Sequence, residues 1–204
     1  MSRMLHLCAL GAILILLPLG TPVPAALGCE IWGTVVAEPS DRPDLGSWRY
    51  RLLISWDTGG AFALSHMDVI LDLQTGRCTC ADFDLALNWL DPVGSAMGDP
   101  APCMILFAPE LNCDGDPSLG VYDKVLKFEP YPDPACEPGT YGVGGFTLYS
   151  DLGPAPIAEP NLFLVDKHGR LACWGSLTGQ FPALPCNPVA ETSRTWSGVK
   201  GVYR

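Results

Sequence analysis

Strict alternation of large apolar and polar side chains marks residues 48–57 as the strongest predicted strand. The apolar positions are Trp48, Tyr50, Leu52, Ile54 and Trp56, and the intervening positions include Arg49, Arg51 and Ser55. A period of two is typical of an extended strand, whose successive side chains point to opposite faces. We therefore expect one face of this strand to line the core and the other to meet solvent.

A second alternating run covers residues 64–73, after a Gly-Gly loop. Met67, Val69, Leu71 and Leu73 share one face, and His66, Asp68, Ile70 and Asp72 share the other. If this strand pairs with residues 48–57, Arg49 and Arg51 lie across from Asp68 and Asp72, and such cross-strand pairs help to fix the register. We expect that pairing.

A hairpin is predicted near the end of the chain. Two apolar segments, 162–165 and 170–174, flank the sequence Asp166-Lys167-His168-Gly169. We expect a four-residue loop in which Gly169 takes a positive φ and His168 is solvated.

The rest of the chain predicts further short strands over residues 30–36, 103–107, 121–129 and 146–150. Residues 81–90 suit either a strand or a short helix, and their alternation favours a strand. Roughly eight short strands between Pro- and Gly-rich turns predict an all-β fold, namely a disulfide-stabilised antiparallel β-sandwich.

Composition supports one folded domain, which we place at residues 26–188. The chain has 204 residues, of which 48% are hydrophobic and only 17% charged. This is enough apolar material for a core of ordinary size and too little charge for a disordered chain.

Residues 1–25 resemble a secretory signal peptide, with Arg3 before an apolar run and small residues near Ala25. The mature protein is then secreted or extracytoplasmic, without a membrane span. An uncleaved anchor and a lipid attached to Cys29 are the alternatives. We interpret residues 189–204 as a flexible C-terminal tail.

Nine cysteines are present, and removal of Cys8 with the signal segment leaves an even set. The remaining cysteines are Cys29, Cys78, Cys80, Cys103, Cys113, Cys136, Cys173 and Cys186. In an exported chain such a set predicts up to four disulfides. We expect Cys78 and Cys80 to bond to different partners and Cys173 to bond to Cys186. The scattered spacing does not match the paired ligands of structural zinc sites.

The formal net charge of -10 makes nucleic acid an improbable partner, because phosphate backbones are repelled. The acidity favours solubility and also permits cation binding.

Short motifs give a resemblance to uncharacterised secreted bacterial β-domains. These motifs are the aromatic strand at residues 48–52, the Leu64-Ser65-His66 strand that leads to cysteines, the Lys167-His168-Gly169 turn, and the tail at 195–204. The resemblance covers about half of the chain and implies a secreted or surface β-domain. It carries over no catalytic residue.

Oxygen ligands on alternate residues suggest a calcium loop. Glu110, Asn112, Asp114, Asp116 and Ser118 match the early positions of an EF-hand-like loop, with Gly115 at the bend. Val121 stands where that motif needs a bidentate Glu, so the sequence favours an ordinary Asp-Gly turn and leaves calcium binding as the alternative.

Catalytic motifs are weak in this chain, and we predict no catalytic residue. The sequence has no nucleophile elbow, phosphate-binding loop or His-Glu-x-x-His motif. His66 and Asp68 project from one strand face as two potential ligands or acid–base groups. We expect a structural role instead, in which His66 hydrogen-bonds the backbone and Asp68 pairs with an arginine. We expect Trp32, Trp48, Trp56, Trp89 and Trp174 to pack in the core.

These features favour a secreted or cell-surface, non-enzymatic module with a structural or binding role. Its partner would be a surface protein or a glycan. The alternatives are a carbohydrate-binding or glycoside-hydrolysing domain that uses surface carboxylates, and a calcium-stabilised adhesion-type module.

Overall fold

The computed structural model describes residues 28–60, 62–71, 78–157, 162–169 and 171–184. The predicted signal peptide, the predicted C-terminal tail, Asp72 and Cys186 lie outside the described residues.

Strands dominate the described chain. They are β1 (Glu30–Pro39), β2 (Trp48–Asp57), β3 (His66–Leu71), β4 (Gly94–Asp99), β5 (Met104–Asn112), β6 (Val125–Pro130), β7 (Glu137–Pro138), β8 (Tyr141–Ser150), β9 (Pro154–Pro156), β10 (Leu162–His168) and β11 (Leu171–Pro182). One described helix, α1 (Cys80–Ala86), stands between β3 and β4.

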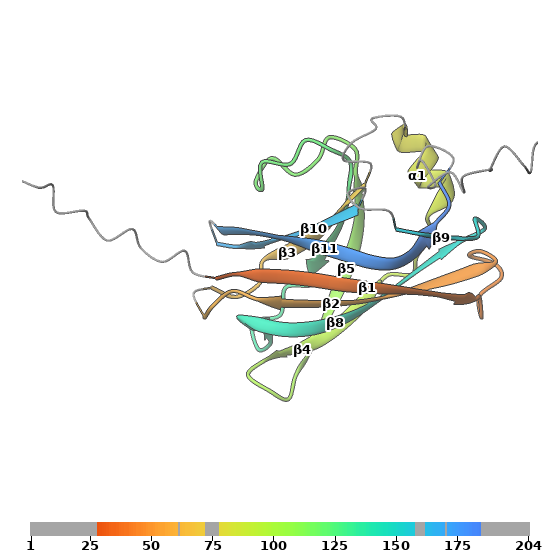
Figure 1. Ribbon diagram of the computed structural model, residues 1–204. Coiled ribbons are helices and arrows are strands. Elements are labelled where there is room, and N and C mark those ends of the chain that lie inside the picture. The colour runs from red at the N-terminus through yellow and green to blue at the C-terminus, as the bar shows by residue number, and fades with distance from the viewer. Residues whose placement is uncertain (1–27, 61, 72–77, 158–161, 170, 185–204) are drawn as a thin grey trace, which may run out of the picture.

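The strands close into a nine-stranded barrel in the order β1-β2-β8-β4-β5-β6-β3-β10-β11 (Figure 1). Parallel pairing of β1 with β11 closes the ring, and the other pairings are antiparallel. The short strands β7 and β9 lie off the ring against β4 and β11. The all-β prediction is confirmed, but the predicted sandwich is wrong. Alternation defines an inward face without showing whether that face packs on a second sheet or curls around its own core.

Aromatic side chains fill the barrel. The largest fully buried side chains are Trp56, Tyr50, Phe83, Phe107, Phe128, Phe146 and Phe181. Phe128 stacks on Phe146 with ring centroids 4.6 Å apart, and Phe107 meets Phe146 edge-on at 5.2 Å. The predicted inward faces of β2 and β3 are therefore confirmed, and the interior is a packed core.

The expected pairing of β2 with β3 is wrong. β2 lies between β1 and β8, while β3 lies between β10 and β6. Arg49 therefore bonds Glu38 at 2.9 Å and also Asp41. Asp68 faces Lys127 of β6 instead of an arginine. The side-chain pattern fixes which face of a strand is buried, but it does not identify the neighbouring strand.

The segment that favoured a strand after Cys80 is instead the helix α1. Thr79 caps it: its side-chain oxygen accepts from the Asp82 N–H at 3.3 Å, and the Asp82 carboxylate accepts from the Thr79 N–H at 2.7 Å. This reciprocal pair is a capping box with Asp in place of the usual Glu. The helix places Phe83 in the barrel core.

The predicted hairpin forms with a shorter turn. Gly169 has φ +61, as expected, but Asp166 and His168 are still strand residues that pair with Cys173 and Leu171. Both point inward, because alternate residues of β10 line the core. His168 is 0% exposed, so the predicted solvated turn histidine is wrong.

Three disulfides join described residues, and they support the predicted oxidised framework. They are Cys29–Cys173, Cys80–Cys113 and Cys103–Cys136. Cys78 is also disulfide-bonded. The predicted Cys173–Cys186 pair is wrong, because Cys173 bonds the residue before β1 where β1 and β11 run side by side. The same bond uses the Cys29 sulfur that a lipid would need.

No described helix is long and apolar enough to cross a membrane.

Candidate functional site

Two buried clusters of histidine and carboxylate lie on opposite sides of the barrel wall. The outer cluster is His66 and Asp68 on the outward face of β3, together with Asp116 from the loop 113–124. The inner pair is Asp166 and His168 on the inward face of β10. All five residues are at most 6% exposed.

A short loop covers the outer cluster. The loop 113–124 joins β5 to β6 and packs Leu119 and Val121 against Ile70 and Val165. This apolar contact explains why β3 is buried on both faces. The outer cluster is therefore shielded from water by the loop and the barrel wall together.

The loop holds the Asp116 carboxylate in a fixed position. Its Oδ1 accepts the Ser118 N–H at 2.8 Å, and its backbone carbonyl accepts the N–H groups of Leu119 and Val121 at 3.0 and 3.1 Å. Gly115 has φ +79, and a Cβ there would lie 2.5 Å from the Val121 carbonyl oxygen. Only glycine allows this tight turn.

The outer cluster has an unusual lack of hydrogen bonds. His66 Nε2 lies 2.9 Å from Asp116 Oδ2, but the geometry is not that of a hydrogen bond. Neither Asp68 oxygen has a hydrogen-bond partner. One ligand atom from each of the three residues lies within 4.8 Å of the others. Buried polar atoms without partners are rare and call for an explanation.

Burial dominates the electrostatics of this cluster. It raises the pKa of Asp68 to about 7, with the Asp116 charge adding to the effect. Burial also lowers the pKa of His66 to about 4, helped by Lys127. The imidazole is therefore neutral near pH 7, which leaves a ring nitrogen lone pair for a ligand contact.

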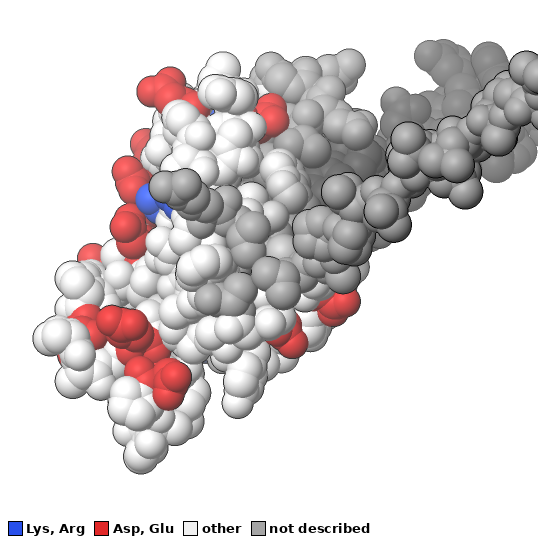
Figure 2. All heavy atoms as spheres, turned by 90° about the vertical axis from the view of Figure 1, so that its left-hand side faces the viewer, with Lys and Arg blue, Asp and Glu red and all other residues white. Residues whose placement is uncertain are grey.

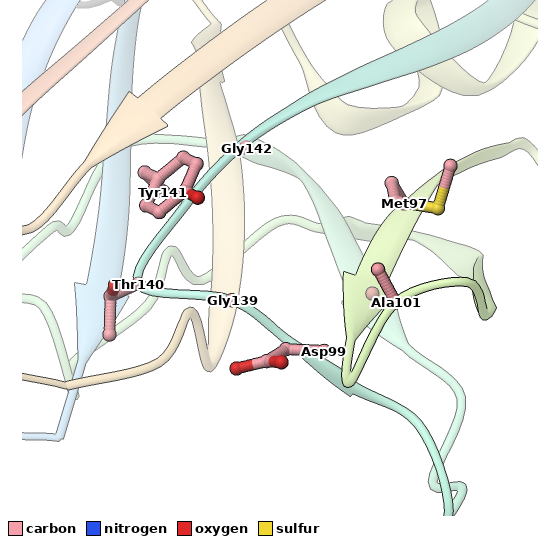
Figure 3. A pocket seen from close by; sticks show the side chains of 8 residues that line it. Met97, Asp99, Ala101, Gly139, Thr140, Tyr141 and Gly142 are labelled. Atoms are coloured by element: carbon pink, nitrogen blue, oxygen red, sulfur yellow. The ribbon is translucent and has the colours of Figure 1, made fainter.

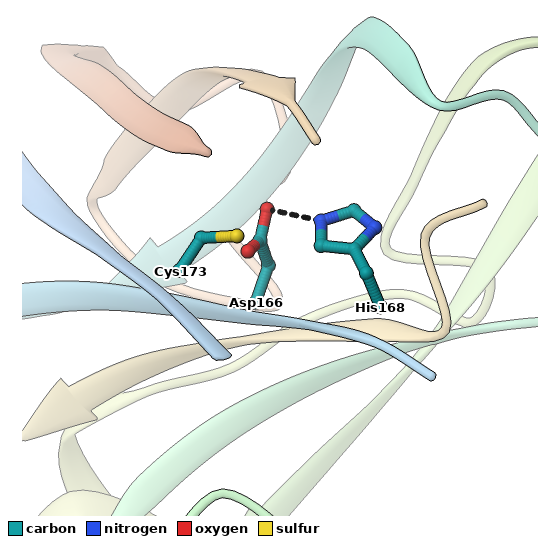
Figure 4. Close-up of side chains that lie close together, drawn as sticks. All are labelled: Asp166, His168 and Cys173. Atoms are coloured by element: carbon teal, nitrogen blue, oxygen red, sulfur yellow. Dashed lines mark ion pairs between the residues drawn. The ribbon is translucent and has the colours of Figure 1, made fainter. Parts of the chain in front are cut away.

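The inner pair repeats the contact in the core (Figure 4). His168 Nε2 lies 2.9 Å from Asp166 Oδ2, and both residues are 0% exposed. Burial raises the pKa of Asp166, and the neighbouring His168 partly offsets the effect. As in the outer cluster, neither side chain of this pair has a hydrogen-bond partner among the described residues. Cys173 completes a set with ligand spacing, but its sulfur is committed to Cys29. The inner pair therefore offers two ligands and no access for a substrate.

The predicted calcium residues do not converge as a group among the described contacts. Glu110 and Asp114 are exposed, and Asn112 Oδ1 accepts the Asp114 N–H at 3.2 Å within the turn. Ser118 contacts Asp116 through its backbone N–H, which donates to Oδ1. Asp116 alone of the five joins the outer cluster. The sequence singled out His66, Asp68 and Asp116 separately, but it gave no signal that the loop folds back on β3.

A neutral apolar band crosses the outer surface of five strands. One row reads Thr34, Leu53, Gly145, Ser95 and Leu106 across β1, β2, β8, β4 and β5. The neighbouring row lies two residues away on each strand and consists of Trp32, Ser55, Val143, Met97 and Met104. The large apolar members, with Val36, are 43% to 60% exposed. We call this surface the apolar band.

The expectation that the tryptophans pack in the core holds only in part. Trp56 is 1% exposed and lies in the core. Trp32 and Trp174 are 47% and 50% exposed, and both stand at outward strand positions. The sequence did not predict that Trp32 and Trp174 are exposed. The pattern of a strand alone cannot distinguish its inward from its outward face when both carry apolar residues.

Gly145 leaves a shallow groove of about 490 Å³ in the apolar band. A Cβ built at this position meets no atom within 4 Å, so the absence of a side chain contributes to the hollow. Glu30 and Asp57 face each other at one border of the band, and Arg51 pairs with Val36 at the other border and lines the groove. The band is therefore apolar in its middle and acidic along one border.

A second hollow, of about 240 Å³, lies where β4 meets the start of β8 (Figure 3). Met97, Asp99, Thr140 and Tyr141 are among its lining residues. Asp99 is the acid among them, and Glu137 of β7 pairs with it across the strands. The carbohydrate-binding alternative finds an exposed tyrosine and two carboxylates here, and it stays a prediction.

Acidic side chains gather along the margin of the face shown in Figure 2, where few basic ones appear. This distribution matches the net charge of -10. No protein-family model matches the chain, and no curated protein matches it significantly. A function is therefore inferred from the fold and from the geometry of the two buried clusters and the apolar band.

Proposed function

We propose that this chain is an exported, disulfide-linked β-barrel module that binds a protein partner through the apolar band and catalyses no reaction. The observation that carries the proposal is the run of uncharged side chains across five strands of an otherwise acidic protein. Contiguous exposed apolar patches of this kind mark interaction sites.

The barrel interior supports an outward-facing role. Aromatic side chains occupy the core, so the space that ligand-carrying barrels use is filled. Both described histidines are at most 4% exposed, which leaves them unable to reach a substrate as general bases.

The shape and charge of the apolar band define the partner. The apolar band, which includes Leu53, Met97 and Leu106, suits an apolar surface of matching shape on the partner. The acidic border at Glu30 and Asp57 favours a partner with basic side chains beside its apolar patch. Methionines adapt their shape to a partner better than branched side chains do.

A photo-crosslinking amino acid at Leu53 tests the proposal in the host that makes the protein. We expect a discrete adduct from Leu53 and none from Tyr122, which is 78% exposed outside the band. Gly145→Glu fills the groove with a charge and should abolish the adduct, whereas Gly145→Ser should keep it. Equal labelling from both positions, or an adduct that survives Gly145→Glu, would refute docking through the band.

A further inference from the structure

The contact between His66 and Asp116 brings two potential ligand atoms together. Their atoms are 2.9 Å apart without hydrogen-bond geometry, so the pair is not explained as a donor and an acceptor. Zinc bonds of about 2.0–2.2 Å in a tetrahedral site place neighbouring ligand atoms about 3.3–3.6 Å apart. The observed pair is closer than this, so binding an ion would move the two atoms apart by about 0.4 Å.

The environment of Asp68 gives a second, independent reason to expect a cation in the outer cluster. Its side chain is 0% exposed, and both oxygens lie without a hydrogen-bond partner beside the other two ligand atoms. A carboxylate in such a place is strongly destabilising unless a cation or proton neutralises it.

Lys127 does not remove this problem. Its Nζ lies 3.8 Å from Asp116 Oδ2 and 3.3 Å from Glu129 Oε2, and it makes no hydrogen bond to Asp68. One lysine that is shared with an exposed glutamate cannot satisfy two buried carboxylates. The cluster therefore still lacks a cation at its centre.

We infer that the outer cluster binds one divalent transition-metal ion, of which zinc is the common biological example, through His66, Asp68 and Asp116. An imidazole nitrogen with two carboxylates suits zinc, with water as the fourth ligand. Calcium takes six to eight oxygen ligands and rarely uses nitrogen. This site thus shares only Asp116 with the calcium loop that the sequence suggests, and it binds a different metal.

The ion would fasten the loop 113–124 to the barrel wall. The Cys80–Cys113 disulfide already ties the start of the loop to α1, and the metal would bind its middle through Asp116. His66 and Asp68 supply the wall side of the contact. The site is structural in this arrangement, because the loop leaves no route for a substrate.

Zinc binding by the chelator-treated, disulfide-intact chain tests the inference. We expect about one zinc per chain by equilibrium dialysis, and binding at least about 100-fold weaker in His66→Gln and in Asp68→Asn, because changes next to a ligand already cost about 10–100-fold. Asp166→Asn and His168→Gln are matched controls in the inner pair, and they should keep zinc binding. Asp68→Asn preserves volume and removes a buried charge, so it remains informative if His66→Gln does not fold.

Limited proteolysis gives a second readout that does not depend on affinity. Chymotrypsin cleavage after the exposed Tyr122 should slow when zinc is added to the wild-type chain, and calcium should have no such effect. Asp68→Asn should lose this protection. Absence of bound zinc, equal protection by calcium, or equal loss of zinc in the Asp166→Asn control would overturn the inference.

Discussion

A single buried carboxylate, that of Asp166, makes the free energy of unfolding depend on pH. Asp166 is held at 0% exposure beside His168, and burial raises its pKa. In the range between the unfolded pKa of about 4 and the raised value, the folded chain binds more protons than the unfolded chain. This residue therefore makes the protein less stable as the pH rises through that range.

Replacing Asp166 with Asn should remove that dependence, because an amide keeps the size of the side chain without titrating. The free energy of unfolding in urea, measured from about pH 4 to pH 8, should rise for Asp166→Asn relative to wild type by about 1.4 kcal/mol per unit of raised pKa. Asp114→Asn, at an exposed loop position, is the control and should show no such trend. A difference that stays constant with pH would contradict this account of Asp166.

Local elements show what the sequence could and could not predict. The faces of β2 and β3 followed from alternation, and the positive φ of Gly169 followed from the turn sequence. The helix α1 stood only as the alternative for residues 81–90, because their period-two alternation favoured a strand and the possible cap at Thr79 was not considered. The outer cluster was missed as a unit because it depends on the loop 113–124 folding back over β3, and that contact is tertiary.

The cap of α1 is open to a direct test. Thr79→Ala removes the side-chain oxygen that accepts from the Asp82 N–H, and we expect it to lower the free energy of unfolding by about 1 kcal/mol. Thr79→Ser keeps the oxygen and should stay close to wild type. If both variants lose the same amount in urea unfolding, the capping bond does not stabilise the helix.

At the scale of the whole molecule, the disulfides differ in the length of chain they enclose. Cys29–Cys173 spans 144 residues, and Cys80–Cys113 and Cys103–Cys136 span 33 each. A cross-link stabilises mainly by restricting the unfolded chain, and longer loops gain more. The bond between Cys29 and Cys173 also lies where β1 meets β11 and completes the ring.

The double variant Cys29→Ala/Cys173→Ala should therefore lose more stability than Cys80→Ala/Cys113→Ala. The chain-entropy relation gives about 5 kcal/mol for the long loop and about 4 kcal/mol for the short one. Midpoints of urea unfolding for the two double variants would measure the difference. A larger loss from the Cys80–Cys113 variant would mean that local packing, rather than loop length, sets the order.

The parallel pairing of β1 with β11 also limits the order in which the strands can pair while the chain is synthesised. β1 meets one neighbour, β2, almost as soon as it is made, but it must wait for its other neighbour until β11 has been synthesised. No N-terminal fragment can complete the ring, and Cys29 has no native partner until Cys173 emerges. The nascent protein thus stays open along the β1 edge until β11 has been synthesised, and a truncation before β11 leaves that edge free to pair with other chains.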